Sequence, residues 1–115
     1  MPVIVKEVGA ELLEGPVLVT IEYSVISGQE TEFVKAMRQY ARTRRRDGAY
    51  RWGIYRDTEI ANGFVEIFLV HSWAEHLRQH ERHTKADRKL EERVYSYVAG
   101  EPKVRHLLYA ESTKS

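Results

Sequence analysis

Three short segments of the sequence have the spacing of a helix capping box, in which Ser or Thr is followed three residues later by Glu or Asp. They are Ser27–Glu30, Ser72–Glu75 and Thr84–Asp87. In such a box the hydroxyl accepts a backbone amide of the first turn, and the acid binds back to the capping residue. The chain of 115 residues is therefore predicted to contain three helices, each beginning just after one of these segments.

The residues after each segment indicate how far each helix extends. In the first helix, apolar residues recur at helical spacing until the cations of 42–46, which precede an Asp-Gly turn. The second helix is predicted over 73–83. The third is predicted over 85–98, because a Gly and a Pro follow it closely.

Four other segments have the pattern of β-strands. Residues 17–25 alternate, with apolar side chains on one face and Thr, Glu and Ser on the other. The segments 49–56 and 64–73 flank an Asn-Gly sequence typical of β-hairpin turns. A last strand is predicted over 104–110.

The order β-α-β-β-α(α)-β is that of a ferredoxin-like α+β domain with an antiparallel sheet. This domain is predicted over 16–111, after an N-terminal arm over 1–15 and before a polar tail over 112–115. In such a domain the helices cover one face of the sheet only, yet apolar residues occur on both faces of the predicted strands. We therefore expect a homodimer in which the helix-free faces of two sheets pack together.

The composition argues against several classes of function. A net charge of +1 argues against nucleic acid and against an anionic membrane as partners. No apolar run approaches the roughly 20 residues that a membrane-spanning helix needs, so no membrane insertion is predicted. The sequence has no cysteine, which excludes disulfides and thiolate metal sites and fits a cytoplasmic location.

Three stretches, 15–23, 44–52 and 64–84, carry a resemblance to a known family. Together they resemble the antibiotic-biosynthesis-monooxygenase group. More closely, they resemble the soluble domain at the C-terminus of some major-facilitator-type efflux proteins, the transmembrane secretion effector group. The resemblance covers about residues 15–110. It implies a dimeric α+β barrel with a pocket in each subunit, between the sheet and the helices.

The resemblance also implies a choice of activities. Some members oxygenate polycyclic aromatic substrates without metal or flavin, others bind and degrade haem, and many have no established activity. In the oxygenases, a Trp at the end of the hairpin's second strand matches Trp73, and an Asn four positions earlier corresponds to Leu69. The haem-degrading relatives have an Asn on the first strand, whereas the only Asn of this chain is Asn62, in the turn.

Four histidines fall within thirteen residues, at His71, His76, His80 and His83. His76 and His80 have an i, i+4 spacing that can chelate zinc or copper, but the surrounding Arg and Lys residues disfavour a divalent cation, so no metal site is predicted. His80 corresponds to a His that relatives place on the helix facing the pocket. There an imidazole could deprotonate a phenol-like substrate. The alternative is a half-buried His whose nitrogens bind a backbone carbonyl or a tyrosine.

Aromatic residues at strand positions suggest a pocket for a flat polycyclic ligand. The predicted catalytic residues are His80 and Trp73. The predicted substrate-binding residues are Tyr23, Trp52, Tyr55 and His83. The alternative is that these aromatic residues form plain core or the dimer interface.

The arginine-rich run 42–46 could hold an anionic substrate. The favoured interpretation is a solvated helix end, with partial pairing to acids such as Asp47 and Asp57.

These features predict a cofactor-independent monooxygenase-like domain that acts on a hydrophobic or aromatic small molecule. The alternative is a non-catalytic dimeric module that binds a ligand or regulates a partner, like the efflux-protein domains. Haem binding and degradation is a third interpretation.

Overall fold

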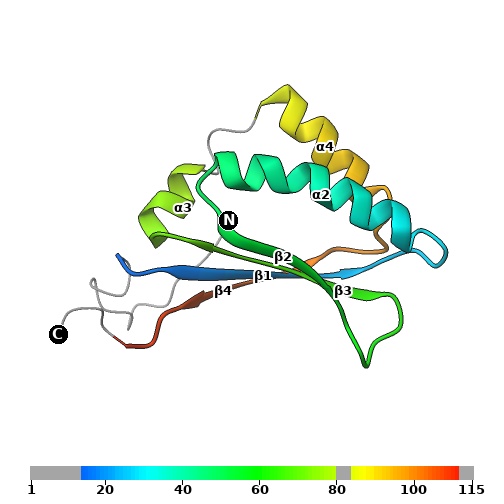
Figure 1. Cartoon of the computed structure of the whole chain (residues 1–115), viewed down its shortest axis with the longest axis horizontal. Helices are drawn as coiled ribbons and strands as arrows, with labels where there is room; N and C mark the ends of the chain where they lie inside the picture. The colour runs from blue at the N-terminus through cyan, green and yellow to red at the C-terminus, as the bar shows by residue number, and fades with distance from the viewer. Residues whose placement is uncertain (1–13, 80–83, 112–115) are drawn as a thin grey trace.

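The computed structural model describes residues 14–79 and 84–111, which form seven helices and strands (Figure 1). In chain order these are β1 (Val17–Ser24), α2 (Glu30–Arg46), β2 (Tyr50–Arg56), β3 (Gly63–Val70), α3 (Trp73–Gln79), α4 (Lys85–Tyr95) and β4 (Lys103–Leu108). This is the β-α-β-β-α(α)-β order of a ferredoxin-like α+β domain, so the predicted fold class is confirmed.

The four strands form one antiparallel sheet in the order β2-β3-β1-β4. β1 lies between β3 and β4, with Ile21 opposite Glu66 on one side and Val104 on the other. All three helices lie on the same side of the sheet (Figure 1). The sheet therefore has a helix-covered face and an open face.

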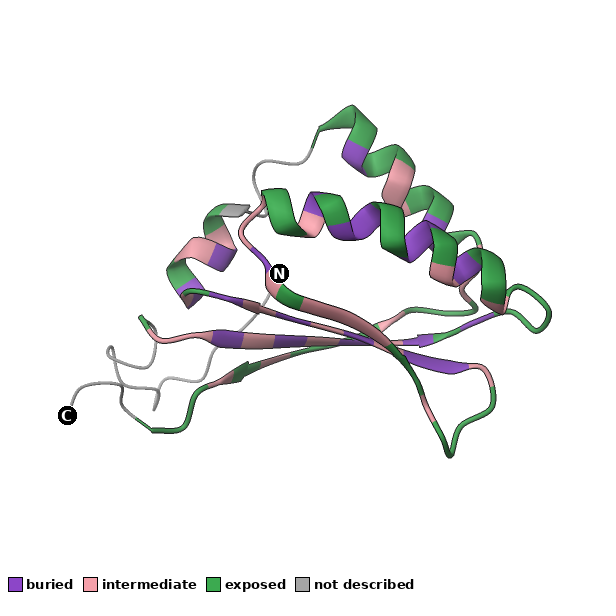
Figure 2. Ribbon diagram, viewed as in Figure 1, coloured by how far each residue is buried: buried purple, intermediate pink, exposed green. Residues whose placement is uncertain are grey.

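The core lies between the helix-covered face and α2. Alternate residues of β1 are buried there, from Val17 to Tyr23. The inner side of α2 packs against them and is buried along its length (Figure 2), with Phe33 and Met37 fully enclosed. Truncating either side chain to Ala would cost about 2–5 kcal/mol of stability, because it removes apolar contacts and leaves a cavity.

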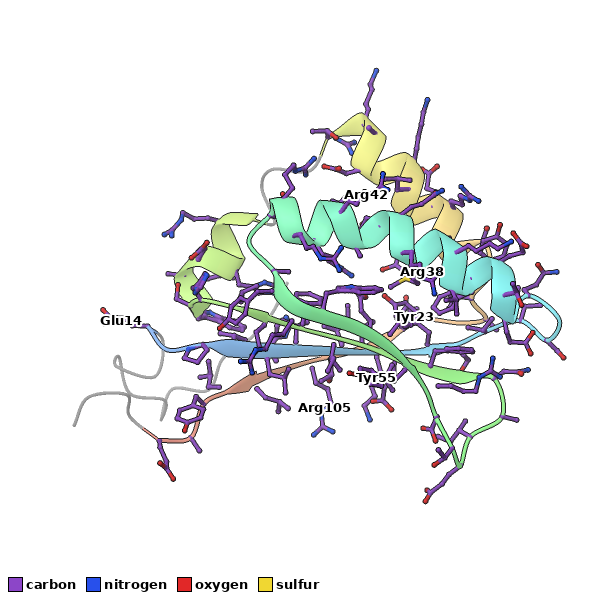
Figure 3. The ribbon with its side chains drawn as sticks, in the orientation of Figure 1. Glu14, Tyr23, Arg38, Arg42, Tyr55 and Arg105 are labelled. Carbon is purple, nitrogen blue, oxygen red and sulfur yellow. The ribbon has the colours of Figure 1, made fainter. Side chains whose placement is uncertain are left out.

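The other face of the sheet, which we call the open sheet face, carries many apolar side chains without a helix over them in the described part of the chain. The strand register assigns to it Leu18, Thr20, Glu22, Tyr55, Val65, Ile67, Leu69, Arg105 and Leu107. Tyr55 is 58% exposed and Leu107 is 44% exposed. Figure 3 shows Tyr55 and Arg105 on this side of the sheet and Tyr23 on the helix side.

The predicted capping boxes have three different outcomes. Thr84 and Asp87 form a complete box at the start of α4, as predicted. At the start of α3, the hydroxyl of Ser72 accepts the Glu75 amide at 3.0 Å. The box predicted at Ser27 is wrong. There Gly28, at a φ of +88°, lies in the turn that leads into α2, which begins at Glu30 after Gln29 and has no side-chain cap.

The predicted helix over 85–98 is too long, because α4 ends at Tyr95. Beyond it the backbone pairs with the continuation of β1. Val98 forms a bridge with Val25, and the Ala99 amide donates to the Ser24 carbonyl at 2.8 Å. These strand-like hydrogen bonds replace the last turn that the sequence pattern suggested.

The hairpin prediction is confirmed, although its second strand ends at Val70 instead of residue 73, where α3 has already begun. Asn62 occupies the left-handed region with a φ of 60°, as the turn requires. The last strand ends at Leu108 rather than at residue 110. Residues 80–83 of the second predicted helix lie outside the described residues, as do most of the predicted arm and the whole tail, so the domain boundaries stay predictions.

Candidate functional site

A buried carboxylate lies at the centre of the helix-covered face. Glu66 is in the middle of β3, is fully buried and points toward α2. Its Oε1 accepts the Tyr23 hydroxyl at 2.8 Å and Nη2 of Arg44 at 3.0 Å. Its Oε2 accepts Nε of Arg44 and Nε1 of Trp52, both at 2.8 Å. We call these four residues the Glu66 cluster.

The four donors occupy the hydrogen-bonding capacity of the carboxylate, since two oxygens offer about four lone-pair sites. Glu66 therefore has no free position from which to accept a proton from a substrate. The fork-shaped contact with Arg44 supplies the counter-charge that a buried carboxylate requires. This arrangement holds β1, β2, β3 and α2 together through side chains.

Arg44 is enclosed by rings as well as by the carboxylate. Its guanidinium carbon lies 4.7 Å from the ring centroid of Tyr40 and 4.9 Å from that of Phe68. The side chain is 20% exposed. Burial by itself lowers the pKa of Arg44, but the Glu66 carboxylate outweighs burial and raises it overall. The pKa of Tyr23 is raised by burial first and by the negative charge of Glu66 second, so its phenol stays protonated.

A β-bulge positions the tryptophan of this cluster. The register of β2 shifts between Tyr50 and Gly53, and Arg51 has a φ of 51°. Two residues apart in a regular strand, Tyr50 and Trp52 would share a face. With the bulge, Trp52 reaches Glu66 on the helix side, while Tyr50 lies opposite Leu69 and stacks on His71.

A second polar group lies on the same face, where α3 meets β4. Nε2 of His76 is 3.1 Å from Nε2 of His106, a hydrogen bond in which one ring donates and the other accepts. The Trp73 ring meets His106 edge-on with the centroids 5.2 Å apart. Trp73 and His76 are 6% and 7% exposed, while His106 is half-buried on the edge strand. We call these residues the Trp73–His76–His106 group.

The structure separates the residues that the sequence proposed as one site. Tyr23 and Trp52 are brought together, but their polar atoms bind Glu66, which sequence reasoning missed. Trp73 lies with two histidines, of which His106 was also missed. The only sequence signal for His106 is its alternation with Val104 and Leu108 along β4.

The remaining predicted site residues do not join these groups. Tyr55 lies on the open sheet face, opposite Val65, so the prediction that it shares a pocket with Tyr23 is wrong (Figure 3). The strand alternation sends residues 55 and 66 to opposite faces. His80 and His83 lie outside the described residues, and their predicted roles stay predictions.

The interpretation of the arginine-rich run as a solvated helix end is wrong for Arg44, which belongs to the Glu66 cluster. It holds for Arg46, which is half-exposed and binds Asp47 at 3.0 Å, as predicted. Arg46 also binds Asp87 at 2.7 Å. Asp57 caps its own loop by accepting the amides of Glu59 and Ile60, and within the described residues it forms no ion pair with the run.

Two classes of structure are not found in the described part of the chain. Residues 14–79 and 84–111 contain no group of three or more His, Cys, Asp or Glu residues arranged to hold a metal ion. The same residues contain no helix long and apolar enough to cross a membrane.

Residues 2–114 match the family described as transmembrane secretion effector, which is almost the whole chain. The chain belongs to this family. The closer of the two resemblances that the sequence suggested is thereby confirmed. No curated protein matches the sequence.

Solved structures share the fold of this secretion effector domain. A candidate antibiotic biosynthesis monooxygenase from Caulobacter crescentus superposes with a TM-score of 0.73 at 17% identity, over 86% of this chain and 93% of that one. A similar candidate from Bordetella bronchiseptica superposes with a TM-score of 0.71 at 16% identity, over 84% of this chain and 99% of that one. SnoaB from Streptomyces nogalater, described as a cofactor-independent oxygenase, superposes with a TM-score of 0.70 at 14% identity, over 88% of this chain and 99% of that one. These likenesses confirm the antibiotic-biosynthesis-monooxygenase fold.

Proposed function

We propose that this secretion effector domain binds a flat, hydroxylated aromatic molecule against the Trp73–His76–His106 group and acts on it as a cofactor-independent monooxygenase. The observation that carries the proposal is the hydrogen-bonded imidazole pair beside a buried indole. An indole edge offers a surface for a flat ring, and an imidazole can accept a proton near neutral pH. His106 is on the edge strand, so a ligand would approach from the β4 side.

The proposed chemistry requires only proton transfer and orientation from the protein. A methylene carbon of an anthrone-type substrate gives its proton to an imidazole nitrogen. The carbanion passes one electron to O2, and the two radicals combine to form a C–O bond. The resulting hydroperoxide loses its remaining C–H proton and breaks its O–O bond. Substrate and O2 therefore become quinone and water, with the substrate as the reductant.

The other predicted site residues have defined places in this proposal. The hydroxyl of Tyr23 and the indole nitrogen of Trp52 are bound to Glu66. The two side chains would therefore contact a ligand only through their ring faces. His80 would act as an additional base, as the resemblance to the family implies, and His83 would be a substrate-binding residue.

We also propose that the functional unit is a homodimer joined through the open sheet face. Leu18 lies between Leu69 and Leu107 in the register, which gives a continuous apolar row across three strands. Apolar side chains on one face of a sheet favour burial against a second surface. The same row on a second copy would supply that surface. We place this dimer in the cytoplasm, which suits a chain without cysteine.

Oxygen consumption with an anthrone-type substrate tests the activity. We expect wild-type turnover, and a loss of about 100-fold or more in kcat for His106→Ala or His76→Ala, since a positioned proton acceptor contributes about 10²–10⁴-fold. His71→Ala is the matched control, because His71 is exposed and stacks on Tyr50 away from the pair. Equal activity in all three variants would contradict the assignment.

A non-catalytic ligand-binding or regulatory module is the second candidate. The saturated hydrogen bonds of Glu66 favour it, because this buried carboxylate cannot serve as a base. Binding of the aromatic compound, seen as quenching of tryptophan fluorescence, without oxygen consumption would select this candidate. A haem-absorbance assay addresses the third interpretation, haem degradation, for which β1 lacks the Asn that such relatives carry.

A further inference from the structure

Charge is strongly segregated in this domain, although the chain as a whole has a net charge of only +1. The helices α2 and α4 together carry ten Lys and Arg residues and five Asp and Glu residues, a surplus of five positive charges. The rest of the chain carries eight cations and twelve acids, a surplus of four negative charges. The helix layer is therefore a basic surface on a domain that is otherwise acidic.

Six of these cations are exposed and have no acidic partner among the residues that the structure describes. They are Arg38, Arg42 and Arg45 on α2, and Lys85, Arg88 and Lys89 on α4. Within the described part of the chain, no carboxylate lies within ion-pair distance of any of them. We call them the basic helix surface. No carboxylate of residues 14–79 and 84–111 therefore neutralises their charges, and all six side chains are exposed.

The two groups of three form one surface because the helices pack side by side. On α2 the spacing is i, i+4, i+7, and on α4 it is i, i+3, i+4, so each group occupies one side of its helix. Arg93 of α4 donates to Gln39 of α2 at 2.9 Å between exposed positions, which joins the outer sides of the helices. Figure 2 shows the outward sides of both helices as exposed, and Figure 3 labels Arg38 and Arg42 on α2.

The side chains among these cations limit the kind of partner. Of the large hydrophobic residues that are exposed, only Tyr95 belongs to α2 or α4. A protein interface needs apolar or aromatic anchors at its centre, and a single-stranded nucleic acid needs rings on which bases stack. A surface of anionic lipid headgroups needs neither, because basic residues bind it by charge alone.

We propose that the basic helix surface docks the domain on an anionic lipid bilayer. The inference rests on the unpaired cations and on membership of a family of transmembrane secretion effectors, which places such a domain near a membrane. It requires no insertion and is independent of any catalytic activity. The surface lies on the side of the sheet opposite to the open sheet face, so the proposed homodimer leaves it accessible.

Vesicle sedimentation with the full 115-residue chain tests this docking. The vesicles contain phosphatidylcholine with about 30% phosphatidylglycerol, with pure phosphatidylcholine for comparison. Each Lys or Arg near such a surface strengthens association about fivefold. We expect binding to the anionic vesicles at about 50 mM salt and at least tenfold weaker binding at about 500 mM, where the Debye length falls to a few ångströms.

Two double variants with the same change in net charge separate the location of the charges from their number. Arg38→Glu/Arg42→Glu reverses two charges of the basic helix surface and should weaken vesicle binding at least tenfold. Arg78→Glu/Lys103→Glu reverses two exposed charges elsewhere and should retain binding within about twofold. All four positions are exposed, and circular dichroism checks that both variants fold.

Three results would overturn the proposal. The first is no binding of the wild-type chain to anionic vesicles at low salt. The second is equal weakening in both double variants, which would reduce the effect to net charge. The third is binding to a single-stranded RNA oligomer under the same conditions with no binding to vesicles, which would assign the surface to nucleic acid.

Discussion

The hydroxyl of Tyr23 on β1 donates a 2.8 Å hydrogen bond to Oε1 of Glu66 on β3, with both side chains buried. The residue directly opposite Glu66 is Ile21, so Tyr23 reaches the carboxylate diagonally across the strand pair. A hydrogen bond to a charged acceptor in a dry environment is worth more than a neutral one. The pairing therefore contributes to the register of β1 against β3 as well as to stability.

Replacing Tyr23 with Phe should lower the free energy of unfolding by about 2 kcal/mol, because it removes a buried hydrogen bond to a charged group and keeps the ring. Urea denaturation measures this loss. Tyr55→Phe is the matched control, since Tyr55 is exposed on the open sheet face. Its effect should stay within about 0.5 kcal/mol of the wild type. Equal losses in the two variants would show that the Tyr23–Glu66 bond contributes no stability.

Glu66→Gln should destabilise the domain by about 3 kcal/mol, because Arg44 then keeps a largely buried charge without a counter-charge. Arg44→Met/Glu66→Gln removes both charges, and the Gln carbonyl can still accept from Tyr23 or Trp52. We expect the double variant to be more stable than the single Glu66→Gln variant in the same urea assay. A double variant that loses the sum of the two single losses would argue against a coupled ion pair.

Asp87 on α4 pairs with Arg46 on α2, and this contact should make the stability of the domain depend on pH in the acid range. Hydrogen bonds from Arg46, and then from Thr84, hold the pKa of its carboxyl well below its usual range. Because the folded-state pKa is below the unfolded value of about 3.9, the stabilisation is present at neutral pH and is lost as pH falls below about 5 toward the folded pKa. Asp87→Asn should lower the free energy of unfolding by about 1 kcal/mol at pH 7, because the substitution weakens the capping box.

The same variant should show a smaller loss of unfolding free energy between about pH 5 and pH 2 than the wild type. Urea denaturation at a series of pH values measures how steeply the free energy of unfolding falls with pH in the variant and in the wild type. Glu92→Gln, at an exposed position of α4, serves as the control and should follow the wild-type slope. A slope for Asp87→Asn that matches the wild type would contradict the role of Asp87.

Leu69→Arg should convert the proposed dimer to a monomer that keeps its fold, because it would place a charge in the apolar row that Leu69 forms with Leu18 and Leu107 on the open sheet face. Sedimentation velocity at micromolar concentration measures the mass, and circular dichroism checks the fold. Lys89→Glu, on the outer side of α4, should remain dimeric. A wild-type chain that sediments as a monomer would exclude the proposed assembly at that concentration.

The elements that were predicted well are those whose signals lie within a few residues. The Thr84–Asp87 capping box forms as the spacing indicates, and Asn62 adopts the positive φ that a turn favours. The box at Ser27 was wrong because Gly28 extends the turn before α2, and the same four-residue pattern does not distinguish a turn from a cap. Strand alternation grouped the apolar residues of β1 on one face correctly, because the pleat alternates whatever the partner strand is.

The candidate site depended on contacts between distant segments. Glu66 had no local signal, since an acid at an inward strand position is meaningful only when its partners are known. Those partners come from positions 43, 22 and 14 residues away. His76 and His106 are 30 residues apart and meet only because α3 packs over the edge strand. The arginine-rich run could not be divided into the buried Arg44 and exposed neighbours before the packing of α2 was known.

The sequence by itself determined the order of the helices and strands, the hairpin and the faces of the strands, because hydrogen bonds and side-chain alternation over a few residues set these features. Only the tertiary structure decided which side chains meet: a buried Glu66–Arg44 pair, an imidazole pair beside Trp73 and the cations of a basic helix layer. Electrostatic energy depends on distance and burial in three dimensions. A net charge of +1 along the chain therefore says little about how the charges are arranged on the folded domain.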